Sequence, residues 1–335
     1  MDQNSFKQTK TRRGFTYSYH FSAPVGDKPT LLFCHGFPTP AHVWNKVVAF
    51  FEPLGYGIVA PDLLGYGGTD KPTDPKFYIG SGHAQDVVDI LDKENIGKVI
   101  ALGHDWGSRV VSRIANYHSD RLIACAFIGT GYGPPASAMA DPITLSAQIK
   151  EAMGYDVLAY MQYFIHPDTP VMLEKNFDSF FSLLFPVPTT AEQPEEIWKE
   201  NMCVAGGAKA WIEANRTTAL PPHISPEDKE YYRGALLGGG LTAPLCWYRV
   251  LVEKCNQEDD AKVPEKSHHL DKPVLSVAFT KDPICLPVFA NTSHAQYIKP
   301  ENLTNAEIDG DHWAVMSHAS EVNKVLLRWI EDLKV

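Results

Sequence analysis

Short apolar runs alternate with amphipathic stretches over the first 130 residues of the chain. The runs end in glycine or polar turns, as buried strands do, and the stretches between them carry apolar residues at helical spacing. The predicted strands are 15–23, 30–36, 57–62, 98–104 and 121–130, and the predicted helices are 42–55, 81–96 and 106–118. This alternation predicts a mostly parallel, doubly wound α/β sheet.

The alternation stops between about Gly131 and Thr242, where no convincing buried strand is found. The periodic segments there are helical: 144–153, 156–164, 171–185, 195–205, 209–215 and 225–237. The last of them begins with Ser225 as the N-cap, followed by Pro226 and, three residues after the cap, an acidic residue. Strands at 272–280 and 301–310 and a helix at 320–333 then resume the first pattern. We therefore expect an α/β core formed by residues 1–131 and 243–335, with a helical lid, residues 132–242, inserted into it.

Composition and charge limit the possible functions. The 335 residues carry a formal net charge of −10, which disfavours a nucleic-acid groove or an anionic membrane surface as a partner. No stretch approaches the run of about 18 apolar residues that a membrane-spanning helix needs. The polar, basic first residues lack the apolar core of a signal peptide. The six cysteines show no metal-ligand spacing, so buried, reduced thiols are expected. We expect a cytoplasmic protein without a cofactor or metal.

The sequence GHDWG, residues 103–107, joins a predicted strand to a predicted helix. It has the spacing of the nucleophile elbow G-x-S-x-G, but Asp105 stands where a hydroxyl group is expected. An ionised carboxylate needs no activating base, and it attacks an sp³ carbon by displacement to form an alkyl-enzyme ester. Hydrolysis of that ester then requires a base and an oxyanion hole.

The base and its partner are expected later in the chain, because in elbow enzymes the acid and then the histidine follow the nucleophile. His312 lies in a loop-like stretch after a predicted strand and is the candidate base. Asp282 directly follows the preceding strand and is the candidate that fixes the imidazole tautomer and stabilises imidazolium. Asp309 and Asp311 are competitors for this role, but they are very close in sequence to His312.

The oxyanion hole is expected to consist of two main-chain donors. The residue after the nucleophile, Trp106, supplies one N–H group. The segment CHGFP, residues 34–38, follows an early strand, and Gly36 lets its backbone approach the elbow closely. Phe37 is the expected second donor, because Pro38 has no N–H group.

The chain contains four short motifs: HGFP (35–38), GHDWG (103–107), KDPI (281–284) and GDHW (310–313). Their order and approximate spacing resemble those of the epoxide hydrolase branch of the α/β-hydrolase family. The resemblance covers nearly the whole chain. The resemblance implies an α/β-hydrolase core with a helical cap, and two cap tyrosines whose hydroxyl groups bind and protonate the epoxide oxygen. Tyr248, in WYR, matches one position; Tyr160, in YMQYF, matches the other, with Tyr163 as a competitor. Tyr163, Trp106 and Phe37 are expected to contact the substrate.

The implied activity is that of an epoxide hydrolase acting on a small apolar epoxide and water. Asp105 opens the ring, the tyrosines protonate its oxygen, and water activated by His312 and Asp282 releases a vicinal diol. A haloalkane dehalogenase shares the Asp nucleophile, but it often has a side-chain halide donor where Phe37 stands. A haloacid dehalogenase would need arginines beside the elbow to bind the substrate carboxylate, but Trp106 and Ser108 stand there, although Arg109 is close. A non-catalytic ligand receptor of the same fold often lacks a triad member, and none is missing here. The sequence leaves the oligomeric state open.

Overall fold

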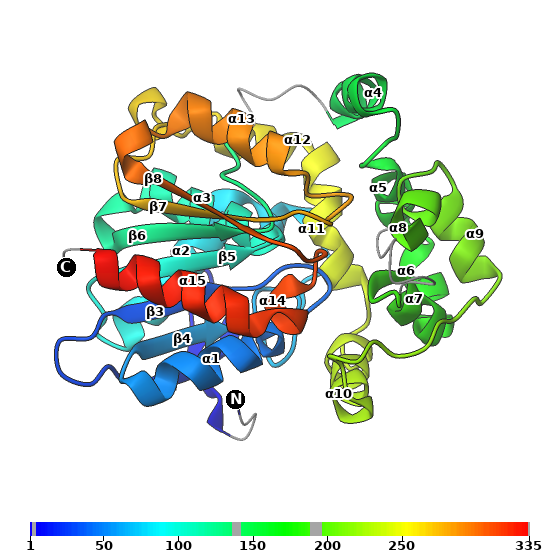
Figure 1. Ribbon diagram of the computed structural model, residues 1–335. Helices are drawn as coiled ribbons and strands as arrows, with labels where there is room; N and C mark the ends of the chain where they lie inside the picture. Colours follow the sequence, from blue (N-terminus) through cyan, green and yellow to red (C-terminus); the bar gives the residue numbers. More distant parts are fainter. Residues whose placement is uncertain (2–4, 136–141, 188–195, 334–335) are drawn as a thin grey trace.

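The computed structural model describes residues 1, 5–135, 142–187 and 196–333 (Figure 1). Its centre is an eight-stranded sheet in the order β1-β2-β4-β3-β5-β6-β7-β8. The pairings of β1 with β2 and of β2 with β4 are antiparallel, and the other pairings are parallel. The strands are β1 (Lys7–Lys10), β2 (Thr16–Ser22), β3 (Thr30–Cys34), β4 (Gly57–Pro61), β5 (Val99–His104), β6 (Leu122–Ile128), β7 (Val274–Phe279) and β8 (Leu303–Ile308).

Helices cover both faces of this sheet. In Figure 1, α1 and α15 lie together on the near side, while α2 and α3 lie together behind the sheet and α12 and α13 lie above it. The core helices are α1 (Asn45–Phe51), α2 (Gly80–Lys93), α3 (Trp106–Tyr117), α11 (Thr242–Val252), α12 (Lys254–Asp260), α13 (Pro287–Tyr297), α14 (Ala314–Ser317) and α15 (Ala319–Asp332). Short 3₁₀ turns occupy Ala41–Trp44, Glu52–Leu54, Pro75–Tyr78, Ser119–Arg121, Glu265–Ser267 and Pro300–Asn302. The predicted mostly parallel α/β sheet is confirmed.

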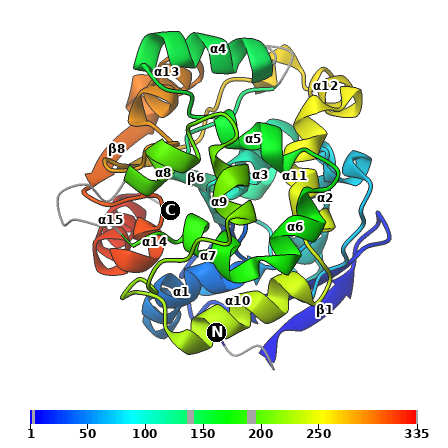
Figure 2. The same ribbon diagram turned by 90° about the vertical axis from the view of Figure 1, so that its right-hand side faces the viewer.

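A group of helices between β6 and α11 lies beside the sheet, at the right of Figure 1 and facing the viewer in Figure 2. We call residues 142–237 the helical segment. Its helices are α4 (Pro142–Met153), α5 (Ala159–Phe164), α6 (Thr169–Lys175), α7 (Phe177–Leu184), α8 (Glu196–Asn201), α9 (Gly207–Glu213) and α10 (Pro226–Leu237).

Local sequence explains where some of these helices begin and end. Ser225 and Asp228 form a reciprocal capping box at the start of α10, as the sequence predicts. The single helix predicted over 171–185 is wrong, because Asn176 (φ −111°, ψ 43°) leaves the helical region and separates α6 from α7. Helix α11 was not predicted, since its residues are buried on nearly every side and show no polar stripe.

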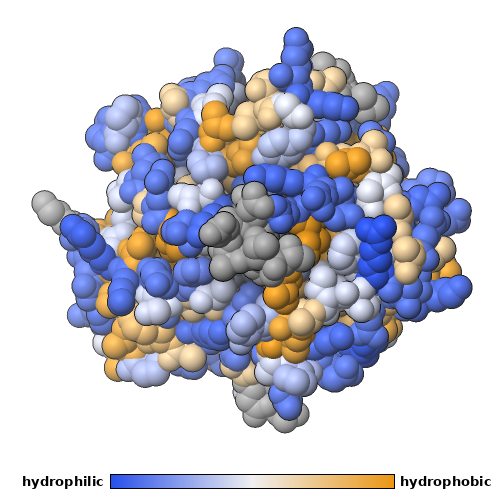
Figure 3. Space-filling model, turned by 45° about the vertical axis from the view of Figure 1, so that its right-hand side comes forward, coloured by the Kyte–Doolittle hydropathy of each residue, from blue (hydrophilic) through white to orange (hydrophobic). Residues whose placement is uncertain are grey.

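The central strands are buried on both faces, since every residue of β3, β4 and β5 is buried. The outer surface mixes hydrophilic and hydrophobic residues, and the apolar patches visible in Figure 3 are small and scattered. Within the described ranges, no single helix is long and apolar enough to cross a membrane. One pair, α10 with α11, bent by 65°, meets the length and composition criteria only when the two helices are taken together.

Candidate active site

The candidate nucleophile lies on a sharp turn between β5 and α3. Asp105 has φ 52° and ψ −124°, and such a positive φ is uncommon for residues other than glycine. The turn is so tight that a Cβ added at Gly107 would lie 2.0 Å from the carbonyl oxygen of Cys34. The elbow therefore holds a carboxylate in a strained conformation at the carboxyl end of a central strand.

Main-chain donors hold the Asp105 carboxylate. Phe37 donates its N–H to Oδ1 over 2.8 Å, and the N–H of Trp106 also hydrogen-bonds the carboxylate. The approach of this loop depends on Gly36, where an added Cβ would lie 2.2 Å from Oδ1. Burial raises the pKa of Asp105, while His312 and the two N–H groups oppose that shift. The two donors lie where negative charge would develop during attack on an ester of this carboxyl group.

His312 and Asp282 form a buried pair beside the elbow. His312 Nδ1 lies 2.6 Å from Asp282 Oδ2, and the Asp282 side chain has no exposed surface. Asp282 Oδ1 accepts the N–H groups of Ile284 and Cys285, each over 2.9 Å. His312 Nε2 faces the elbow, 3.9 Å from Asp105 Oδ2. The structure thus brings the three triad candidates together from the ends of three strands.

The pair controls the charge of both its members. Burial is the largest single influence and disfavours imidazolium, but the Asp282 carboxylate and Cys285, through their charges and hydrogen bonds, together raise the pKa of His312 well above its usual value. Burial would raise the pKa of Asp282, but His312 and the two N–H donors lower it below its usual value. Asp282 is therefore ionised at neutral pH, where it orients the imidazole and stabilises positive charge on the ring.

The two competing aspartates have other partners. Asp309 is exposed, and its Oδ2 lies 3.0 Å from Lys281 Nζ. Asp311 Oδ1 accepts the N–H of Trp313 over 2.9 Å. Neither contact involves the His312 ring, so the geometry favours Asp282 as its partner.

Two buried tyrosines face each other near the carboxylate. Tyr160 lies on α5 and Tyr248 on α11, with ring centroids 5.8 Å apart. The Tyr248 ring packs edge-on against Phe37 at 4.9 Å and Trp106 at 5.1 Å. Burial raises the pKa of both phenols well above the usual value, and the Asp105 carboxylate adds to the shift. Both side chains are therefore protonated hydrogen-bond donors beside Asp105.

Tyr163 points elsewhere, although the sequence singled it out for substrate contact. Its hydroxyl group is buried and has no hydrogen-bond partner among the described residues. Burial, followed by the charge of Glu213 on α9, raises the pKa of Tyr163 to about 12. Tyr160, three residues earlier on α5, is the one that reaches the cavity beside Asp105. The geometry favours Tyr160 over Tyr163, because of the two only Tyr160 lines this cavity.

A cavity of about 510 Å³ lies between the elbow and the helical segment. Its wall includes Asp105 and Trp106 from the core and Tyr160 from α5. The apolar lining side chains include Ile149, Val157, Leu158, Met161, Leu251, Ile284, Leu286 and Phe289. A cavity of this size and lining suits a small, largely apolar molecule.

The structure adds two neighbours that the sequence did not single out. Trp198 of α8 packs on the His312 ring with centroids 5.3 Å apart. Cys285 lines the cavity, and burial raises the pKa of its thiol to about 11. The ligand atoms of Cys285, Asp282 and His312 lie within 4.8 Å of one another, the spacing of a possible metal site. A metal on this set would compete with the short bond between His312 and Asp282. The only sequence signal for Cys285 is its place three residues after Asp282.

Comparisons with known proteins agree with this architecture. A family model described as alpha/beta hydrolase fold matches residues 29–319. Epoxide hydrolase A of Mycobacterium tuberculosis is 28% identical over 309 residues, which cover 92% of this chain and 92% of that protein. Bifunctional epoxide hydrolase 2 of Mus musculus is 26% identical over 317 residues and 93% of this chain, but the chain spans only 53% of the mouse protein.

Solved structures show the same fold. The crystal structure of Epoxide Hydrolase A from Mycobacterium thermoresistibile superposes with a TM-score of 0.81 at 23% identity, covering 99% of both chains. An epoxide hydrolase from an endophytic Streptomyces gives a TM-score of 0.82 at 23% identity, covering 98% of this chain and 96% of that one. The family model matches most of this chain, and the chain has the nucleophile elbow, the sheet order and a histidine late in the sequence. This chain therefore belongs to the alpha/beta hydrolase fold family.

Proposed function

We propose that the chain is an epoxide hydrolase that works through an alkyl-enzyme ester on Asp105. One observation carries the proposal: the elbow carboxylate lies beside two buried, protonated phenols, and it lines a mostly apolar cavity together with one of them, Tyr160. The names of the relatives in M. tuberculosis and M. musculus support the same activity. We also propose that residues 1–131 and 243–335 form the catalytic core and that 132–242 form a cap over it.

Ring opening is the first step. A lone pair of Asp105 Oδ2 attacks one ring carbon, and the carbon–oxygen bond of the ring breaks toward its oxygen. The leaving alkoxide is a strong base, so it takes a proton from Tyr160 or Tyr248 as its charge develops. Phenols whose pKa is raised keep this proton at neutral pH until the ring opens. Two donors on the ring oxygen also orient the opposite face of the epoxide toward the carboxylate.

Ester hydrolysis is the second step. His312 accepts a proton from a water molecule that attacks Cγ of the ester, and Asp282 stabilises the imidazolium that results. The oxyanion forms beside the N–H groups of Phe37 and Trp106. The intermediate then collapses, the bond from Cγ to the alkyl oxygen breaks, and the diol leaves with a proton returned by the imidazolium. The proton left on the regenerated Asp105 carboxyl group returns to the phenolate formed during ring opening, which restores both side chains.

A haloalkane dehalogenase is disfavoured by the donors around the carboxylate. The side chain of Trp106, whose only donor is the indole N–H, hydrogen-bonds the Tyr248 hydroxyl. Phe37 has no side-chain donor, and its main-chain N–H is bound to Asp105. The donors that a dehalogenase uses for the departing halide are therefore already engaged, whereas the two phenols can supply the proton that a departing alkoxide needs and a halide does not.

Trapping the intermediate tests the proposal. In His312→Gln, a terminal alkyl epoxide should form the ester without hydrolysing it, so the peptide containing Asp105 should gain the mass of one epoxide. Asp105→Ala should produce neither ester nor diol. His166→Gln is the matched control, because that side chain is 60% exposed and lies on the outside of the helical segment. Diol formation by Asp105→Ala, or steady turnover of His312→Gln without ester, would refute the covalent route.

A further inference from the structure

A second charged side chain lines the cavity, and the proposed reaction does not use it. Arg109 lies on α3 four residues after Asp105, which is about one helical turn or ~6 Å along the axis. Asp105 and Arg109 are the only charged residues among the described side chains that line the cavity. The cavity wall therefore includes an acidic side chain at the elbow and a basic side chain one helical turn farther along α3.

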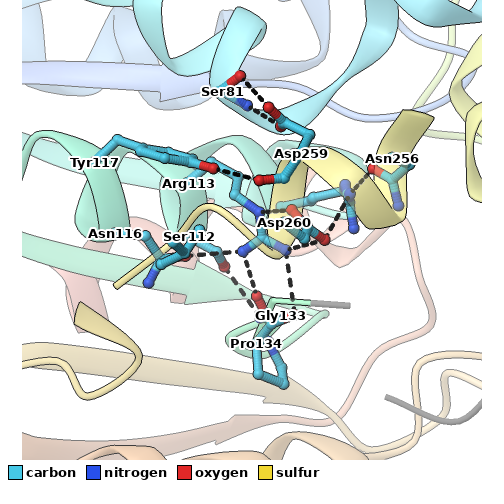
Figure 4. A network of polar contacts seen from close by, with 12 residues as sticks. Ser81, Ser112, Arg113, Asn116, Tyr117, Gly133, Pro134, Asn256, Asp259 and Asp260 are labelled. Carbon is cyan, nitrogen blue, oxygen red and sulfur yellow. Dashed lines mark hydrogen bonds and ion pairs between the residues drawn. The ribbon is translucent and has the colours of Figure 1, made fainter. Parts of the chain in front are cut away.

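Arg109 belongs to a polar network between α3 and α12. Figure 4 shows this network around Arg113 and Asp260. The Asp260 carboxylate on α12 pairs with both Nε and Nη2 of Arg113, at 2.7 and 3.0 Å. Arg109 Nη2 makes a longer contact of 3.4 Å to the same carboxylate and donates to the amide oxygen of Asn256. Arg113 and Asp260 are completely buried, so the network cannot relax by turning toward solvent.

The network leaves the charge of Arg109 only partly compensated. Asp260 is shared by two guanidinium ions, and Arg113 has the shorter, two-point contact. The charge of the neighbouring Asp259 also stabilises the Arg109 cation, but its carboxylate makes its hydrogen bonds to Ser81, whose N–H and hydroxyl group it accepts. Burial, followed by the charge of Arg113, lowers the pKa of Arg109 to about 10, so it is still a cation at neutral pH.

A guanidinium in this state favours an anionic ligand. It has five N–H donors in a planar fork, and both contacts described above use Nη2, so the rest of the fork has donors for a carboxylate. Asp105 does not cancel this preference, because two N–H groups and His312 face its own charge. When the ester forms, that charge is lost altogether.

We propose that Arg109 is a specificity-determining residue that binds a carboxylate on the substrate, so that the enzyme prefers epoxides carrying an acid group a few bonds from the ring. The preference for acids rests on the proposed epoxide hydrolase activity, whereas the anion site itself does not. The spacing of Asp105 and Arg109 along α3 matches a short carbon chain between the epoxide ring and the carboxylate of the substrate. The apolar side chains of the cavity would surround that chain.

Binding of unreactive probes tests the anion site without any catalysis. Hexanoate and hexanamide have the same length and differ in charge. By calorimetry at neutral pH, hexanoate should bind wild-type protein about tenfold more tightly than hexanamide. Arg109→Met should abolish that difference, while Arg216→Met, which removes an exposed arginine of the helical segment, should keep it. Equal binding of the two probes to wild-type protein would overturn the proposal.

Kinetics then tests the preference during turnover. The substrate pair is an epoxyhexanoate with its ring at the end remote from the carboxylate, and the matching amide. In wild-type enzyme, kcat/KM for the acid should exceed that for the amide by about tenfold or more. Arg109→Met should lower kcat/KM for the acid and leave kcat/KM for the amide unchanged. Arg109→Lys, which keeps the charge but not the fork, should give an intermediate ratio and covers the case in which Arg109→Met does not fold. An unchanged ratio of the two kcat/KM values in both variants would refute the role of Arg109.

Hexanoate binding with no diol from either epoxide would instead refute the proposed function and leave the anion site standing.

Discussion

Gly36→Ala tests whether the close approach of the 34–38 loop sets the catalytic geometry. A Cβ at this position would lie 2.2 Å from Asp105 Oδ1 and 2.7 Å from its Cγ, where ordinary contacts begin at 3.4 Å. The carboxylate therefore has to move by about 1.2 Å, or the loop that carries the Phe37 N–H has to retreat by a similar amount. Either movement breaks the 2.8 Å hydrogen bond to Oδ1.

The size of the effect follows from this displacement. A misplacement of about 1 Å costs roughly a hundredfold in rate, and loss of one oxyanion donor costs about 10²- to 10³-fold in kcat. We expect kcat to fall at least about a hundredfold, which corresponds to about 2.7 kcal/mol of activation free energy. Overpacking should also lower the free energy of unfolding by about 1–3 kcal/mol.

Rapid-quench kinetics with a chromogenic epoxide measures both steps, and urea unfolding measures stability. Gly234→Ala is the matched control, because an added Cβ on α10 meets nothing within 4 Å. That variant should keep full activity and gain about 0.5–1 kcal/mol of stability, as alanine does in a helix interior. If Gly36→Ala retained kcat within about threefold of wild type, the proposed role of the loop would be refuted.

Three further predictions concern the tyrosines, the triad and the buried network. Tyr160→Phe should lower kcat/KM by about tenfold to a hundredfold, because one of two proton donors remains. In Tyr163→Phe, kcat/KM should stay within about threefold of wild type. Equal effects of the two substitutions in a steady-state assay would contradict the choice of Tyr160. Asp282→Asn removes the charge that raises the pKa of His312. Since the base must be neutral, the acid limb of the kcat profile should move to lower pH and the plateau should fall by about a hundredfold or more; a limb that stays in place would count against the pair. Asp260→Asn should destabilise the fold by about 3 kcal/mol in urea unfolding, because it leaves a buried guanidinium without its full charge partner, and a change below about 1 kcal/mol would show that the network relaxes.

Much of the core could be predicted because its pattern is local. The parallel strands are apolar along their whole length and end at turns, so β3 to β6 were predicted to within about two residues. The exposed edge strand β1, a polar KQTK stretch, has no such pattern and was missed. The break at Asn176 was also missed, because helical periodicity continues across it and the change in direction comes from packing.

The site divides in the same way. Asp105 was found from the elbow pattern, and Asp282 and His312 from their places shortly after later strands, because the ends of parallel strands meet at one edge of the sheet. The choice between Tyr160 and Tyr163 required the rotation of α5, which three residues of spacing do not determine. The partial burial of Arg109 was equally hidden, because an arginine on an amphipathic helix is ordinarily exposed to solvent, and here α12 packs over it.

The asymmetric hold on Asp105 makes its two oxygen atoms chemically distinct. Oδ1 is held by the Phe37 N–H, so Oδ2 is the atom that attacks the substrate and is released as part of the diol. The oxygen atom of the attacking water then takes the place of Oδ2. In water enriched in the heavy isotope, the first diol released should carry ordinary oxygen and later ones the heavy isotope, while the enzyme never retains more than one marked atom. A second heavy oxygen atom in Asp105 would mean that the carboxylate rotates between turnovers. The fraction of enzyme with two heavy atoms would then give the rate of rotation relative to turnover.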